Sequence, residues 1–84
     1  MDDEFIHSLL PAVEQQASSP DTPFVAPTLE RLIKEEDIEE EEALYMVAFC
    51  LADEIERMDK SDTPFDLARY ELLLKLLPTL PEGQ

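Results

Sequence analysis

Residues 35–42 read Glu-Glu-Asp-Ile-Glu-Glu-Glu-Glu, and residues 43–52 continue as Ala-Leu-Tyr-Met-Val-Ala-Phe-Cys-Leu-Ala. The acidic stretch must stay in water, whereas the apolar stretch favours burial. Together they predict one long helix over residues 39–60, because carboxylates are stabilised in a first helical turn. Its core-facing stripe repeats every three or four residues and consists of Leu44, Val47, Ala48, Leu51, Ile55 and Met58.

Shorter apolar patterns predict helices on both sides of this element. Asp2 and Asp3 are suited to cap a first helix. Pro11 then interrupts the pattern, so the helix kinks there or a short turn precedes a second helix starting at Pro11. Further helices are expected from Pro27 and from Thr63-Pro64, with Thr63 as the N-cap. Their core-facing residues are expected to be Phe5, Ile6, Leu9, Leu10 and Val13, then Leu29, Leu32 and Ile33, and finally Phe65, Ala68, Leu72 and Leu76.

These patterns predict an all-α protein: a small bundle of three main helices plus an N-terminal helix, with a long central third helix. A chain of 84 residues is expected to form one domain. Within it we expect an N-terminal helix at 1–17, a linker at 18–26, a helical core at 27–80 and a frayed tail at 81–84. The single glycine fits helices better than a sheet with many tight turns.

The net charge of −15 limits the classes of partner. Such a charge repels nucleic acid and anionic membranes and attracts basic proteins, so we expect no direct nucleic-acid binding and no membrane binding. The longest apolar run is about half of a membrane span. The chain opens with Met-Asp-Asp-Glu, unlike a basic signal peptide, and a single cysteine allows no intramolecular disulfide. A cytoplasmic protein is the expectation.

Residues suited to catalysis or ligand binding are few. Cys50 lies inside the apolar run, where a thiol is inert, and His7 is the only histidine. The acidic run has neither the glycine nor the alternation of a calcium loop, and one histidine cannot supply a di-iron site. We therefore expect no catalytic residues, no cofactor and no dedicated metal site.

The third and fourth predicted helices carry apolar residues on two sides. One interpretation is that the central helix is surrounded by the other segments. The other is that the second side binds a protein partner, since Met and aromatic residues suit adaptable contacts. The candidate partner-binding residues are Glu42, Met46, Phe49 and Asp53 on the third helix, and Leu67, Tyr70 and Leu74 on the fourth.

The functional hypothesis is a non-catalytic regulatory or adaptor module that binds a protein partner. The expected partner is a basic protein, and a second copy of this chain, forming a homodimer, is the other partner considered. The alternative is a DNA mimic, whose carboxylates replace phosphates and occupy a basic nucleic-acid-binding protein. A mimic requires acidic residues spread along one face. Such a stripe would have to be formed by Glu36, Glu42, Asp53, Glu56 and Asp59.

One tetrapeptide occurs twice. Asp-Thr-Pro-Phe stands at residues 21–24 and again at residues 62–65. An internal duplication is one interpretation. The other is that Asp-Thr-Pro is a common entry to a helix and that a match of four residues arose by chance.

Overall fold

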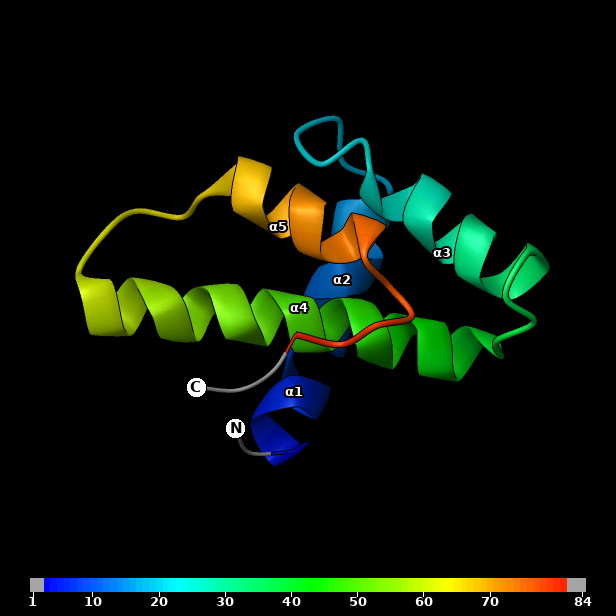
Figure 1. Cartoon of the computed structure of the whole chain (residues 1–84), viewed down its shortest axis with the longest axis horizontal. Coiled ribbons are helices and arrows are strands. Elements are labelled where there is room, and N and C mark those ends of the chain that lie inside the picture. Colours follow the sequence, from blue (N-terminus) through cyan, green and yellow to red (C-terminus); the bar gives the residue numbers. More distant parts are fainter. Residues whose placement is uncertain (1–2, 82–84) are drawn as a thin grey trace.

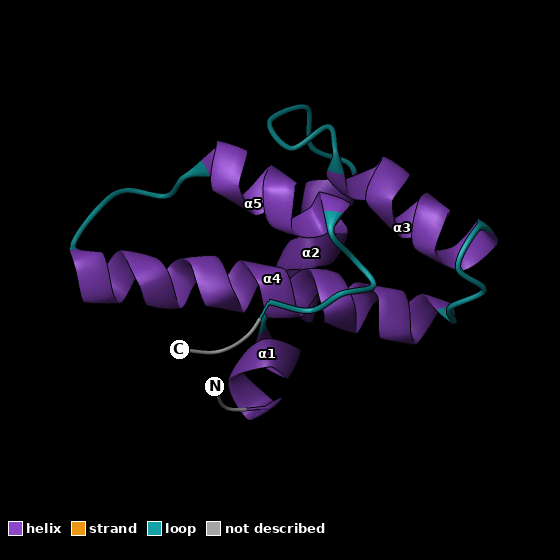
Figure 2. Ribbon diagram, viewed as in Figure 1, coloured by secondary structure: helices purple, strands orange, loops and turns teal. Residues whose placement is uncertain are grey.

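The computed structural model describes residues 3–81, and in this range it contains helices and no strands (Figures 1 and 2). The predicted all-α bundle with a long central helix is therefore confirmed. The capping role of Asp2 and the frayed residues 82–84 lie outside the described residues. The helices are α1 (Asp3–Ser8), α2 (Leu10–Ala17), α3 (Val25–Lys34), α4 (Glu40–Ser61) and α5 (Leu67–Lys75).

Helix α4 is the centre of the bundle and contacts each of the other four helices. Figure 1 shows α3 and α5 on one side of it and α1 on the other. Its first turn contains three glutamates, as the helix dipole favours. It ends where Asp62 adopts a left-handed conformation, with φ 54°, and donates its N–H to the carbonyl of Met58. The buried apolar residues of α4 are Ala43, Val47, Ala48, Cys50, Leu51 and Ala52.

The N-terminal segment forms two short helices. Helix α1 ends at Ser8 and α2 begins at Leu10, with Pro11 in its first turn, where a missing N–H costs little. Of the two predictions for Pro11, the second helix is thus the correct one. Ile6 and Val13 are buried, and both helices pack on α4. The N-terminal helices therefore belong to the same core as the rest of the chain.

Helix α3 begins at Val25, two residues before the predicted start. Its Arg31 extends to the C-terminal end of α5, where Nη2 donates to the Leu74 carbonyl at 3.0 Å and Nη1 to the Leu77 carbonyl at 2.9 Å. The Leu74 carbonyl also accepts the N–H of Leu77 at 3.2 Å, in the turn that ends the helix at Lys75. A guanidinium from α3 thus caps α5 and holds the two helices together.

Helix α5 differs most from the sequence prediction. It begins at Leu67, and its N-cap is Asp66, whose carboxylate accepts the N–H of Arg69 at 3.1 Å. Thr63 and Pro64 lie exposed in the segment between α4 and α5, so the predicted start at Thr63 was wrong. Asp66 supplies the same kind of cap three residues later.

The predicted core face of α5 was also wrong. Leu72 and Leu76 are 58% and 57% exposed, whereas Tyr70 and Leu74 are completely buried. The ring of Tyr70 lies edge-on between Phe24 and Phe65, with centroid distances of 5.7 and 5.6 Å. Burying this large aromatic ring stabilises the fold more than burying one more leucine, so Tyr70 determines which face points inward.

The hydroxyl of Tyr70 donates to Oε1 of Gln16 on α2 at 2.6 Å. This bond satisfies a buried hydroxyl and joins α5 to α2 across the core. In residues 3–81, no helix has the length and apolar character required to span a membrane.

Candidate functional site

The predicted partner-binding residues of α4 have different environments. Glu42 is exposed, but Met46 and Phe49 are half-buried and pack against the core. Phe49 also lies beside Tyr45 of the same helix, with the two rings 6.5 Å apart. The partial burial of Met46 and Phe49 within the chain is what the interpretation of a surrounded central helix expects.

The contact between α1 and Tyr45 is polar as well as apolar. The Tyr45 hydroxyl donates to Oδ1 of Asp3 at 2.6 Å, and its ring lies 5.2 Å from that of His7. The hydrogen bond to Asp3 raises the pKa of Tyr45, because it stabilises the protonated phenol. His7, the only histidine, thus forms part of a surface contact that attaches α1 to α4.

The candidate residues of α5 do not form one surface. Leu67 is 46% exposed, but Tyr70 and Leu74 belong to the core and are unavailable to a partner in this structure. The expectation that these three residues share an outer face was therefore wrong for two of them.

The outer face of α5, which we define as Ala68, Leu72 and Leu76, is apolar and exposed instead. Its residues are spaced by four, so they lie one above the other along the helix. Single exposed leucines are common on protein surfaces, but two neighbouring ones on a short helix form a continuous apolar strip. This face is the candidate interaction surface.

An ionic cluster around the buried Glu54 lies between α4 and the start of α5. Glu54 is completely buried. Oε1 accepts from Nε of Arg57 at 2.9 Å and from Nη1 of Arg69 at 2.7 Å, and Oε2 accepts the backbone N–H of Asp66 at 2.8 Å. Glu54 therefore joins α4 to the start of α5.

The hydrogen bonds of Glu54 determine its ionisation. Burial by itself would raise the pKa of this carboxyl group. The bonds from Arg57, from the Asp66 N–H and from Arg69 outweigh burial and lower the pKa to about 2. Glu54 is thus ionised at neutral pH, and its two arginine partners make its burial tolerable.

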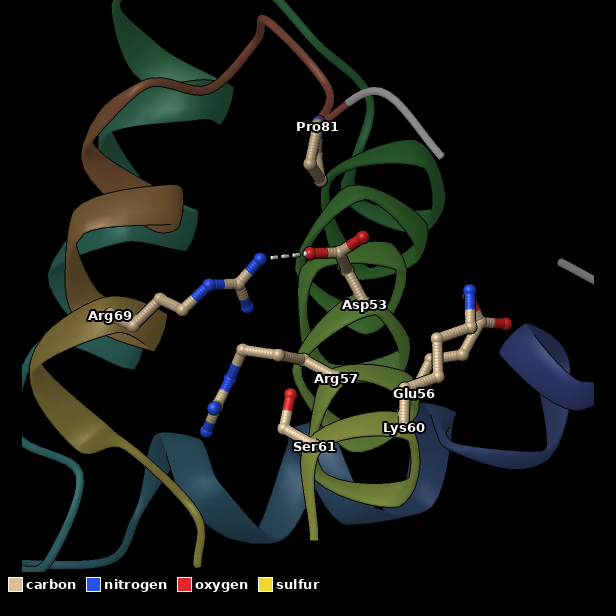
Figure 3. Close-up of a pocket in the computed structure, with 7 residues that line it drawn as sticks. All are labelled: Asp53, Glu56, Arg57, Lys60, Ser61, Arg69 and Pro81. Carbon is tan, nitrogen blue, oxygen red and sulfur yellow. Dashed lines mark hydrogen bonds and ion pairs between the residues drawn. The ribbon is translucent and has the colours of Figure 1, made fainter. Parts of the chain in front are cut away.

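Asp53 completes this cluster, since its Oδ2 lies 2.7 Å from Nη2 of Arg69. Its side chain is 12% exposed. Figure 3 shows the bond between the two side chains across the space between α4 and α5. Asp53 was predicted to bind a partner, but in the structure it binds an arginine of its own chain.

A small pocket opens beside the cluster (Figure 3). Its volume of about 220 Å³ lies below the usual size of a small-molecule site. The arginines in its wall already donate to Asp53 and Glu54. The lining residues are Asp53, Glu56, Arg57, Lys60, Ser61, Arg69 and Pro81.

Cys50 is completely buried. Burial, followed by the charge of Asp53, raises the pKa of its thiol to about 12. The thiolate, which is the nucleophilic form, is therefore scarce at neutral pH. Among residues 3–81, no group of three or more His, Cys, Asp or Glu side chains is arranged to hold a metal ion.

Comparison with known proteins gives no relative. No family model matches the chain, and the searches of curated proteins and of solved structures found no match.

Proposed function

We propose that the protein is a non-catalytic interaction module that binds another protein through the outer face of α5. The observation that carries the proposal is the exposure of Leu72 and Leu76, each by more than half, on a helix whose other side is fully packed. Covering such a strip would remove apolar surface from water, and each leucine would contribute on the order of 1 kcal/mol or more.

The structure beneath this face is suited to a binding surface. The opposite side of α5 is held by the buried Tyr70 and Leu74, and its two ends are fixed by Arg31 and by the Glu54 cluster. A helix fixed in this way loses little conformational freedom when a partner binds, which preserves affinity.

Charge favours a different protein over a second copy of this chain. Each copy carries −15, so two copies repel one another strongly at low ionic strength. A basic protein would instead be attracted at long range and held by the apolar strip at short range. The proposed partner is therefore a basic protein with an apolar contact patch.

The arrangement of the acidic residues gives less support to a DNA mimic. A mimic needs free carboxylates along one face, as phosphates occur along a duplex. Three of the five acids of the required stripe lie beside basic residues: Glu36 with Arg31 at 3.8 Å, Asp53 with Arg69 at 2.7 Å, and Glu56 with Lys60 at 3.6 Å. The interaction module is accordingly the function we propose.

The experiment compares proteins captured from the native lysate by the wild type and by the double variant Leu72→Ser, Leu76→Ser. Ile33→Ser on α3 is the matched control, because Ile33 is also exposed, by 37%. We expect a basic protein to stay bound at high salt to the wild type and the control, and to be lost from the double variant. Equal capture by all three chains would refute the assignment of this face.

A further inference from the structure

The repeated tetrapeptide has two different environments. In the first copy, Thr22 is 7% exposed, and its hydroxyl donates to the carbonyl of Gln16 at 2.8 Å. In the second copy, Thr63 is exposed, and its Oγ1 accepts from Nη1 of Arg57 at 2.8 Å. The Thr63 hydroxyl is thus exposed to solvent beside an arginine, whereas the Thr22 hydroxyl is buried.

We propose that Thr63 is a phosphorylation site for a proline-directed protein kinase, and that Thr22 is not. The kinase would transfer the γ-phosphoryl group of ATP to Oγ1 of Thr63. The bond between the γ-phosphorus and its bridging oxygen breaks, the Oγ1–P bond forms, ADP leaves, and the hydroxyl proton passes to the base of the kinase.

Access favours Thr63. It lies in the segment between α4 and α5, which passes outside the helices at one end of the molecule (Figure 2). A residue that precedes proline is biased toward an extended backbone, the form in which a chain can lie along an enzyme's cleft. Exposed connecting segments are also the parts of a fold that modifying enzymes reach most easily.

Thr22 is instead fixed within a turn. Its N–H donates to the carbonyl of Ser19 at 3.3 Å, and its own carbonyl accepts the N–H of Val25 at 3.2 Å. A kinase would have to break these bonds, and the buried hydroxyl bond to Gln16, before reaching Oγ1. At Thr63 a kinase would have to break only the exposed bonds from Arg57 to Oγ1 and to the Pro64 carbonyl, so less local unfolding is required.

Arg57 provides a partner for the phosphate. Its Nε and Nη2 bind Glu54, and Nη2 also donates to the carbonyl of Pro64. Nη1 already lies within hydrogen-bonding distance of Thr63 Oγ1, so a phosphate on that oxygen would meet the guanidinium directly. Bonds between a phosphate and an arginine are among the strong, charge-assisted ones.

The modification would act on the junction of α4 and α5. A phosphate adds about −1.5 to −2 charges at pH 7 and would compete with the buried Glu54 for Arg57. Glu54 would keep Arg69 and the Asp66 N–H, so the junction would be rearranged but would retain part of its ion pairing.

The first test treats the full chain with a proline-directed kinase and ATP, and locates the phosphate by peptide mapping. The chains are the wild type, Thr63→Val, Thr22→Val and Ser19→Ala, since the half-buried Ser19 also precedes a proline. We expect near-stoichiometric phosphate on Thr63, its loss in Thr63→Val, and no change in the other two variants. Phosphate mainly on Thr22 or Ser19 would overturn the proposal. So would an unmodified wild type beside a fully modified peptide of residues 58–68.

The second test follows the ³¹P signal of phosphorylated Thr63 against pH. Pairing with Arg57 should lower the second pKa of the phosphate from its usual value of ~6, relative to the same phosphopeptide. Arg57→Gln should remove this shift, and Arg57→Lys should keep part of it, with circular dichroism confirming the fold. Equal titration midpoints in the folded protein and the peptide would overturn the contact with Arg57.

Discussion

Replacing Glu54 with alanine should destabilise the protein severely, although its sequence position resembles that of a surface acid. The change removes a completely buried carboxylate and leaves the Asp66 N–H without its acceptor. It also takes the buried acceptor from Arg57, which keeps Thr63 and the Pro64 carbonyl, and from Arg69, which keeps Asp53. Removing one partner of a buried ion pair costs roughly 3–5 kcal/mol. That is a large share of the ~5–15 kcal/mol that stabilises a typical domain.

Glu56→Ala is the matched control on the same helix. Glu56 lies 3.6 Å from Lys60, and both side chains are at least 36% exposed. Exposed pairs of this spacing contribute about 0.3–0.5 kcal/mol. The two variants thus remove the same chemical group from positions that differ in burial and partners.

Urea denaturation followed by circular dichroism measures both variants. The midpoint for Glu54→Ala should fall far below that of the wild type, or the chain should already be unfolded without urea, whereas Glu56→Ala should overlay the wild type. A loss below about 1 kcal/mol in Glu54→Ala, where a buried pair is expected to cost 3–5, would refute the structural role of the cluster.

Three further predictions follow from burial and ionisation. The folded-state pKa of Glu54 is about 2, below its ordinary value of 4.5, so the unfolded state binds more protons between these two pH values. The stability that Glu54 adds over Glu54→Gln should therefore be fully present above pH 4.5 and should vanish as the pH falls toward 2. Thermal melts of both chains across that range measure it. Leu74→Ala should cost roughly 2–5 kcal/mol in urea titrations and Leu72→Ala less than about 0.5, and the reverse order would mean that α5 is packed on its other face. The Cys50 thiol, whose pKa is about 12, should react with a disulfide reagent only as fast as the chain opens, and immediate reaction in native buffer would contradict its burial.

The sequence predicted the long helix well because its pattern has one dominant period. The acidic run at its start and the apolar stripe from Leu44 to Met58 both favour the same element, which spans Glu40–Ser61 against an expected 39–60. Agreement between these independent signals made this helix predictable.

The face of α5 was not predictable from periodicity, because leucines occur on all sides of residues 67–77. The buried face is the one that carries Tyr70, which contacts Phe24, Phe65 and Gln16. These partners lie far away in the sequence or outside the helix. Tertiary contacts of this kind override local patterns.

Glu54 was missed for a different reason. It follows Asp53 and resembles a solvated acid, yet it stands three residues after Leu51 and four before Met58, on the stripe that faces the core. Arg57, three residues later, was the available signal for a buried pair. Thr63-Pro64 is an equally good helix entry in the sequence, and only the tertiary structure shows that Asp66 caps α5 and binds Glu54 through its N–H.

The most direct measurement of the central claim is site-specific photocrosslinking in the cell of origin. A photoreactive amino acid replaces Leu72 on the outer face of α5 in one chain and Ile33 on α3 in another, both of which are exposed positions. We expect one dominant adduct with a basic protein at position 72 and none at position 33. The same adducts at both positions, or adducts at position 33 alone, would contradict the assignment of α5 as the binding surface.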